Sequence, residues 1–445
     1  MDAGPSCPDS APRDSLRAVA LFLGCLAIYH LNGRPHCEVD CVTPPYTAWS
    51  LAKNGSLDLR PHAAHLEQYL GTEVIAQPDG SWIASRPPGM SLVILPLVAP
   101  FAWLGLDTPS VLAMMHIGKL AAAICVALSV VLFFFLVRRW APSTEWPATL
   151  LYALGTSLWS VASQAIWSHG PAVLGICAGL SLLLPGPGMS PSPGRSTWAG
   201  LALGLAVVAR PTTAFFVLAS GLALLAARCW RAAFAFGIAA ALPVVALVVY
   251  NVAYFGDPLM GGYANQGWHG GMPLWQRAIG LLLAPSRGLL VYSPALILAV
   301  PGMFLAWRIG SWARVLLVFW VGAFLMTWSL YTRWPCWWGG WCYGPRFFAE
   351  TMPLLCLLAA FGLALRTAKW QRRATCGLIS LSILIHSLGV FGHSAYAPWH
   401  LRRCESIEQT GRAMFDLNDS QIKAHAREVI LKLSSPFVSR KTTSR

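Results

Sequence analysis

A carboxylate pair, Glu38 and Asp40, directly follows the first apolar segment of the chain. A carboxylate at this place can accept the proton of a hydroxyl group at a membrane surface, which is general-base chemistry. The alternative interpretation is a solvated loop acid. Cys37 and Cys41 bracket the two acids and, together with His36, suggest either a metal site or a local disulfide. The metal site is weakly supported because the sequence contains no second ligand cluster, and the local disulfide is supported no better.

Arginine residues at the ends of apolar segments are suited to binding an anion. Arg210 stands between two apolar runs, and Pro211 begins the second of them. An arginine at such a place is costly unless it reaches water or meets an anion. The free N–H groups at a helix start favour an anion at the same place. We therefore expect Arg210 to contact a lipid phosphate, with snorkelling to the interface as the alternative, and Arg86 adds a second cation before a Pro-Pro-Gly sequence.

An aromatic and glycine-rich stretch, YTRWPCWWGGWCYGPR, occupies residues 331–346. Aromatic faces suit sugar rings and an isoprenoid chain, although an interfacial aromatic belt is the competing explanation. Arg346 and Glu350 are four residues apart at a helix start, so we expect them to pair on one face. Further supporting candidates are His169, for which an interfacial helix cap is the alternative, and Tyr263, His269 and Arg287.

The composition excludes a soluble enzyme. Of the 445 residues, 56% are hydrophobic and 11% are charged, whereas a soluble protein carries roughly a quarter charged residues. Between Gly89 and Tyr396 there are four acidic residues, which fits a lipid environment. The net charge of +14 lies in short basic clusters between apolar runs, so we assign it to membrane topology and expect no nucleic-acid partner.

Twelve apolar segments must position these residues. They are 16–31, 90–106, 111–137, 146–162, 171–184, 198–209, 212–227, 232–250, 289–307, 312–331, 347–365 and 375–391. Lysine and arginine collect in cytoplasmic loops, and the basic clusters alternate correctly with the helices only if 90–106 does not cross. That segment contains Pro96 and Pro100, so we expect a re-entrant or interfacial helix there.

The predicted fold is an all-α polytopic membrane protein with about eleven transmembrane helices. We expect the N-terminal tail and first helix in residues 1–32, and an extracytoplasmic loop with interfacial or re-entrant helices in 33–110. The helix bundle is expected in 111–396, and a C-terminal tail outside the cytoplasm in 397–445. This topology places the candidate site residues at the outer membrane boundary rather than at the midplane, where a transporter would carry them.

Seven sequence motifs and their order along the chain resemble the GT-C superfamily of integral-membrane glycosyltransferases. Within this superfamily, the chain is most similar to a bacterial branch described as dolichyl-phosphate-mannose mannosyltransferase-like or RgtA/B/C/D-like. The motifs cover about residues 16–366 and read NGRPHCEVDC with GSLDL, SRPPGMSL, GTSLWSVASQAIWSHGPA, GLALGLAVVARPT, YNVAYFGDPLMGGY, APSRGLLVYSPAL and WWGGWCYGPRFFAETMPLL. The cysteine pair beside Asp40 departs from the usual family pattern, in which a small polar neighbour stands there.

The resemblance implies a polyprenyl-phosphate sugar donor, an extracytoplasmic glycan, lipid or protein acceptor, and inversion at the anomeric carbon. Asp40 matches the family's catalytic aspartate by position, with Glu38 as its neighbour. Arg86, Arg210 and Arg346 correspond in kind to the basic residues near outer helix ends that hold the lipid phosphate in this family. Family members often use a divalent metal ion, but no ligand set for one is identifiable in this sequence. The implied location is the plasma (inner) membrane, with the site on the extracytoplasmic side.

The chemistry of the residues agrees with that resemblance. A sugar leaving on a lipid phosphate needs no general acid, but it needs a base for the acceptor and cations for the developing charge. We expect Asp40 to be the base, Arg210 and Arg346 to share the phosphate, and Glu350 to orient Arg346. His169 would add a hydrogen bond. The alternatives are a lipid flippase or a non-catalytic polymerase partner in envelope assembly.

Overall fold

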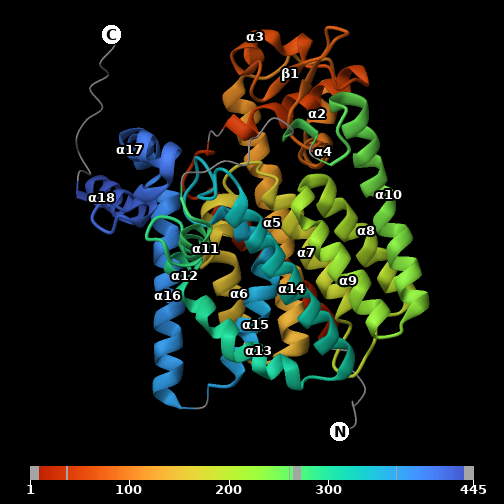
Figure 1. Cartoon of the computed structure of the whole chain (residues 1–445), viewed down its shortest axis with the longest axis vertical. Coiled ribbons are helices and arrows are strands. Elements are labelled where there is room, and N and C mark those ends of the chain that lie inside the picture. The colour runs from red at the N-terminus through yellow and green to blue at the C-terminus, as the bar shows by residue number, and fades with distance from the viewer. Residues whose placement is uncertain (1–9, 37–38, 260, 264–271, 367, 435–445) are drawn as a thin grey trace.

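The computed structural model describes residues 10–36, 39–259, 261–263, 272–366 and 368–434. Its helices form a bundle, and a smaller cap lies over one end of it (Figure 1). The helices of ten or more residues are α1 (Ser10–His30), α2 (Thr43–Asn54), α4 (Gly89–Trp103), α5 (Val111–Trp140), α6 (Glu145–Leu154), α7 (His169–Leu183), α8 (Pro193–Ala209), α9 (Ala214–Ala226), α10 (Trp230–Phe255), α11 (Leu274–Leu283), α13 (Ala299–Arg308), α14 (Ser311–Arg333), α15 (Met352–Ala364), α16 (Lys369–Phe391), α17 (Tyr396–Thr410) and α18 (Gln421–Ser434).

Every apolar segment predicted from the sequence contains a helix, and the predicted all-α polytopic fold is confirmed. Two segments are interrupted. The segment 289–307 breaks at Ser293, because Pro294 lacks an N–H and disfavours helical geometry in the residue before it. It therefore forms α12 (Leu289–Tyr292), a 3₁₀ helix (Pro294–Leu298) and α13. The segment 146–162 forms α6 and then a π-helical turn (Leu158–Ala162).

Among the described residues, five helices are long and apolar enough to cross a membrane. They are Val111–Trp140, Trp230–Phe255, Trp312–Arg333, Arg346–Ala364 and Lys369–Phe391. Shorter apolar helices, such as α7 and α9, complete the bundle. His169 begins α7, and Arg210 precedes α9, so polar side chains lie at the ends of these short helices.

The cap consists of α2, α3 (Ala63–Leu66), α4 and a hairpin of β1 (Val74–Ala76) and β2 (Trp82–Ala84). The strands are antiparallel, with Val74 opposite Ala84. Neither strand was predicted from the sequence, although the turn contains a Pro-Asp-Gly sequence that favours hairpins. The helices α2 and α4 pack on each other and bury Tyr46 and Trp49 between the cap elements.

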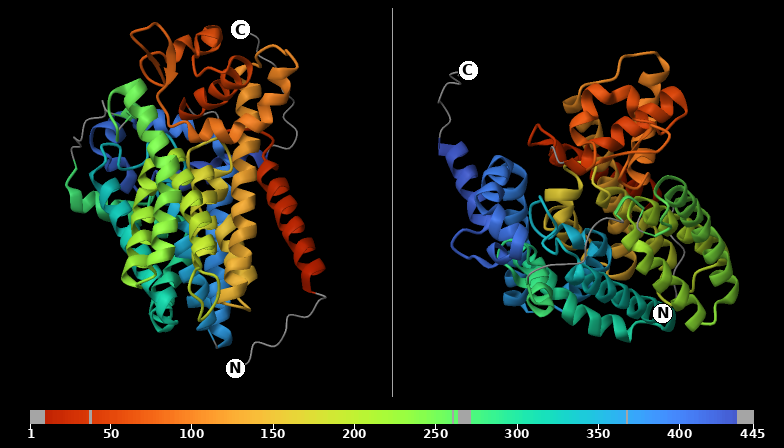
Figure 2. Two further views of the ribbon diagram at one scale, coloured as in Figure 1. Left: turned by 90° about the vertical axis from the view of Figure 1, so that its right-hand side faces the viewer. Right: turned by 45° about the horizontal axis from the view of Figure 1, so that its top comes forward.

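The cap lies at the end of the bundle where α1 ends and α5 begins, and α1 starts at the opposite end (Figure 2). The C-terminal helices α17 and α18 stand beside the bundle near the cap (Figure 1). These two helices and α11 were not predicted from the sequence. The cap and the C-terminal helices therefore lie toward the same end of the bundle (Figure 1).

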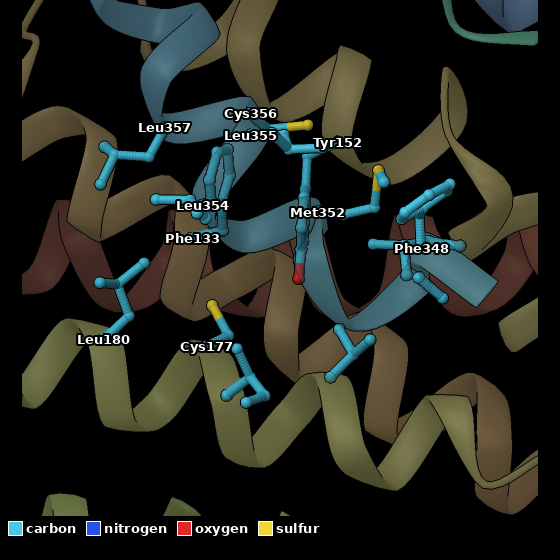
Figure 3. Packing of buried hydrophobic residues seen from close by; sticks show 14 of the residues in the cluster. Phe133, Tyr152, Cys177, Leu180, Phe348, Met352, Leu354, Leu355, Cys356 and Leu357 are labelled. Atoms are coloured by element: carbon cyan, nitrogen blue, oxygen red, sulfur yellow. The ribbon is translucent and has the colours of Figure 1, made fainter. Parts of the chain in front are cut away.

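The centre of the bundle is α15, whose residues Met352–Gly362 are all buried. Figure 3 shows Met352, Leu355 and Cys356 of this helix packed among side chains of α5, α6 and α7. Helix α13 approaches α15 closely, since a Cβ added at Gly302 would lie 1.7 Å from the Leu358 carbonyl oxygen. Small residues at such contacts allow membrane helices to pack backbone to backbone. This rigid centre carries the residues that precede α15, including Arg346 and Glu350.

Candidate functional site

A cavity of about 540 Å³ lies between the cap and the bundle. Its polar and charged lining residues are Asp40, Arg86, Ser168, Arg210, Thr212, Tyr331 and Arg346. The remainder is mostly apolar and is lined by residues that include Met90, Phe215, Leu259, Leu330, Trp334 and Phe347. The structure therefore brings together the predicted base and all three predicted phosphate-binding arginines, from segments up to 306 residues apart.

Asp40 lies in a one-turn 3₁₀ helix (Val39–Cys41) between α1 and α2. Its Oδ1 atom accepts a hydrogen bond from Arg86 Nη2 at 2.7 Å, and its Oδ2 atom lies 3.3 Å from Arg346 Nη1. Burial raises the pKa of the Asp40 carboxyl, but the two guanidinium groups outweigh burial and hold the pKa below its usual value. Because 30% of the side chain is exposed to the cavity, the carboxylate remains accessible to a hydroxyl group.

Arg86 is fixed from behind by Glu73, which sequence reasoning missed. Glu73 accepts two hydrogen bonds from Arg86, at 2.6 Å from Nε and 2.5 Å from Nη2. This bidentate pairing fixes the plane of the guanidinium group. The hairpin explains the pairing, since the Ser85 N–H donates to the Glu73 carbonyl oxygen and so places Arg86 beside the Glu73 side chain. The Pro-Asp-Gly turn was the available signal.

Arg346 begins a 3₁₀ helix (Arg346–Thr351) that leads into α15. Its guanidinium carbon lies 4.5 Å from the centroid of the Trp167 ring, within the range of a cation–π interaction. The same carbon is 5.6 Å from the Phe347 ring centroid, and that of Arg210 is 5.9 Å from it. The two guanidinium groups are therefore less than about 12 Å apart, which is compatible with the predicted shared anion.

Arg210 ends α8 in an extended conformation, with φ −148° and ψ 102°, as expected for a residue that precedes a proline. Its Nη1 donates to Ser168 Oγ at 3.0 Å, and its Nη2 donates to the Tyr331 hydroxyl at 2.6 Å. Its Nε lies 2.7 Å from Glu350 Oε1. The guanidinium group is thus held on three sides, and Tyr331 and Ser168 accompany it at the cavity wall.

Glu350 does not orient Arg346, and the predicted pairing of these two residues is wrong. In the 3₁₀ helix, residues three apart share a face, so residues four apart point in different directions. Glu350 instead contacts Arg210 and accepts from His169 Nδ1 at 2.6 Å. His169 is 1% exposed and supports Glu350 from the protein interior, away from the cavity lining.

The remaining candidates have other surroundings. Arg287 is buried, and it donates to the carbonyl oxygens of Trp338 and Gly340 rather than lining the cavity. Glu38, Cys37 and His269 lie outside the described residues, and Tyr263 ends a short 3₁₀ helix (Gly261–Tyr263). No group of three or more His, Cys, Asp or Glu residues suited to a metal ion occurs in the described parts of the chain.

No protein-family model and no curated protein sequence matches the chain. Among solved structures, ArnT from Cupriavidus metallidurans, crystallised with undecaprenyl phosphate, aligns with a TM-score of 0.53 at 14% sequence identity. The alignment covers 96% of this chain and 79% of ArnT, a GT-C glycosyltransferase. The chain has a GT-C fold.

Within this GT-C fold, the mostly apolar cavity also contains a carboxylate that lies between two arginine side chains. Asp40, in the cavity lining, lies between Arg86 and Arg346, whereas Glu350, behind the lining, contacts Arg210 and accepts a hydrogen bond from His169. An incoming anion can displace a carboxylate from its arginine partners without leaving those arginines uncompensated. The site is therefore suited to a ligand with one phosphate group and a long apolar part.

Proposed function

We propose that the chain is an inverting glycosyltransferase that moves a hexose or pentose from a polyprenyl-phosphate donor to an extracytoplasmic acceptor. The observation that carries this proposal is the cavity, in which an aspartate contacts two arginines and most of the remaining lining is apolar. The undecaprenyl phosphate bound to ArnT, a protein of the same fold, supports a polyprenyl-phosphate ligand. The motif resemblance supports a mannosyltransferase-like role in the cell envelope.

The proposed reaction is a single displacement at the anomeric carbon. The acceptor hydroxyl oxygen forms a bond to this carbon and gives its proton to Asp40. The bond from carbon to phosphate oxygen breaks, and its electron pair stays on the released polyprenyl phosphate. The phosphate gains one negative charge in this step. The guanidinium groups of Arg86, Arg210 and Arg346 line the same cavity and can stabilise that charge. Attack opposite to the leaving group inverts the anomeric configuration.

Donor binding would also prepare the base. Arg86 and Arg346 lower the pKa of Asp40 and hold it as a carboxylate, which makes it a weak base. A donor phosphate that takes hydrogen bonds from the same arginines weakens these ion pairs. The pKa of Asp40 then rises toward its ordinary value, and the carboxylate becomes a better proton acceptor for the second substrate.

A divalent metal ion fits neither Asp40, the described carboxylate in the cavity lining, nor Glu73 and Glu350 behind it. Each of them is already paired with an arginine, and no third ligand stands beside them among the described residues. The arginines supply the positive charge that the phosphate requires. We therefore assign no step of the reaction to a metal.

The activity test uses the full chain in lipid nanodiscs with radiolabelled polyprenyl-phosphate sugars and a membrane extract as the acceptor source. We expect transfer by the wild-type chain and a rate lower by roughly 10²–10⁴-fold for Asp40→Asn. Arg333→Lys is a matched control, because Arg333 is exposed at the end of α14 and donates within its own helix to Ser329. Binding of polyprenyl phosphate without transfer or donor turnover would instead favour a flippase or polymerase partner.

The membrane side is tested separately. We propose a multi-pass protein of the plasma (inner) membrane with the cap outside the cytoplasm. In a background with the exposed Cys376 changed to serine, Asp107→Cys in the cap should react with an impermeant maleimide added to intact cells. Arg314→Cys, at the start of α14 and far from the cap, should react only after lysis. The reverse pattern would place the site in the cytoplasm.

A further inference from the structure

The C-terminal helices hold the loop that delivers Arg346 to the cavity. This loop, residues 334–345, connects α14 to the 3₁₀ helix that begins at Arg346 and is called here the Trp-rich loop. Several contacts join it to the C-terminal segment. A Cβ added at Gly411 would lie 2.7 Å from Trp337 Nε1, and the Trp341 and His400 ring centroids are 4.1 Å apart.

Gln421, the first residue of α18, lies at the centre of this contact and is fully buried. Its Nε2 donates to the Cys342 carbonyl oxygen at 2.9 Å, and its Oε1 accepts from the Gly344 N–H at 3.2 Å. Oε1 also accepts from Arg287 Nη1. The backbone N–H of Gln421 donates to Ser286 Oγ at 3.1 Å, which fixes the start of α18 against the segment that carries Arg287.

Arg287 extends the same network along the loop. Its Nε donates to the Trp338 carbonyl oxygen at 2.6 Å, and its Nη2 donates to the Gly340 carbonyl oxygen at 3.2 Å. Together, Gln421 and Arg287 bind four backbone groups between positions 338 and 344. These groups need such partners because the loop forms neither helix nor strand, and buried backbone groups without partners are costly.

The loop backbone in turn supports the Arg346 side chain. Gly339 and Gly340 both have positive φ, at 86° and 65°. A Cβ added at Gly339 would lie 3.3 Å from Arg346 Cγ, and one at Gly340 would lie 3.5 Å from Arg346 Nη2. The guanidinium group is thus held between this glycine backbone and the Trp167 ring, where it faces Asp40. Movement of the loop would change the distance between Arg346 and Asp40.

We propose that Gln421 is a positioning residue, which acts through the Trp-rich loop to set Arg346 against Asp40 and the donor phosphate. The part that concerns the phosphate rests on the function proposed above. The C-terminal segment is accordingly a part of the site's support. The C-terminal segment fixes the position of the Arg346 guanidinium group. Such positioning matters because a displacement of about 1 Å at a binding group is enough to reduce catalysis strongly.

The test is a double-mutant cycle between Gln421→Leu and Arg346→Lys, with the full chain in nanodiscs and undecaprenyl phosphate as the probe. We expect each single variant to bind the lipid about tenfold more weakly. The double variant should be little worse than either, because both changes remove the same interaction. Additive losses, or unchanged binding by Gln421→Leu, would overturn the proposal. Lys432→Met, near the other end of α18, is the matched control and should bind normally.

The same cycle is measured by thermal unfolding without lipid, which separates this inference from the proposed function. If the wild-type chain does not bind undecaprenyl phosphate, the donor assignment fails. Coupling between Gln421 and Arg346 in the unfolding midpoint would still support the positioning role, and additive midpoints would reject it. Should Gln421→Leu not fold, Gln421→Glu replaces it, because glutamate keeps the acceptor for Arg287 and loses the donor to Cys342.

Discussion

Replacing Asp40 by asparagine should change transfer and donor binding in opposite directions. The substitution keeps the size of the side chain but removes the charge that lies between Arg86 and Arg346. Loss of a general base reduces the rate by roughly 10²–10⁴-fold. The same substitution releases the two arginines from contacts of 2.7 and 3.3 Å, so we expect the donor phosphate to bind at least as tightly as in the wild type.

The gain in binding can be bounded from the contacts. A hydrogen bond to a charged group contributes roughly 1.5–3 kcal/mol, and the donor phosphate displaces at least part of the shorter contact between Asp40 and Arg86. If about half of that energy is recovered, binding tightens by up to about 1.4 kcal/mol, or roughly tenfold. The longer contact with Arg346 adds less.

The assay combines initial transfer rates with equilibrium binding of undecaprenyl phosphate. Asp107→Asn is the control, because it removes an exposed carboxylate of the cap and should leave both values unchanged. Weaker binding by Asp40→Asn would show that Asp40 supports the donor site rather than competing for its arginines. Near-normal transfer would move the base to another carboxylate and refute its assignment to Asp40.

Three further predictions concern the same cavity. Arg210→Lys and Arg346→Lys should each raise the KM for the donor about tenfold despite the retained charge, because lysine cannot reproduce bidentate contacts; Arg333→Lys should have no effect, and equal values for all three would argue against phosphate contact. Glu350→Gln should reduce transfer as Arg210→Lys does, and the two changes should combine non-additively. Additivity with Arg210→Lys, together with coupling to Arg346→Lys, would instead support a pairing of Glu350 with Arg346. Arg86 and Arg346 lower the pKa of Asp40, so these ion pairs are lost only when the pH falls through that lowered value. The acid limb of the kcat/KM profile, which reports the free enzyme, should therefore lie at lower pH than the acid limb of kcat, which reports the enzyme–substrate complex. The opposite order of the two limbs would contradict release of Asp40 by the donor.

The sequence predicted the helices because a bilayer imposes a simple requirement on the chain. Apolar runs must form helices to satisfy their backbone groups, and prolines and basic clusters mark where those helices end. The same rule placed Asp40, Arg86, Arg210 and Arg346 at helix ends on one side, where the cavity contains them all. The cap hairpin and the C-terminal helices were missed because they lie outside this rule and are short or polar.

The sequence by itself determined which residue types stand at the helix ends around the cavity and therefore which chemistry the site can perform. Only the tertiary structure decided which charges pair. Glu350 contacts Arg210 rather than Arg346 because a 3₁₀ helix turns the two residues apart, and Glu73 reaches Arg86 because a hairpin folds back. Gln421 supports the Trp-rich loop although it lies 77 positions after Gly344 in the sequence. Such pairings depend on the relative positions of separate elements, which no local pattern of residues contains.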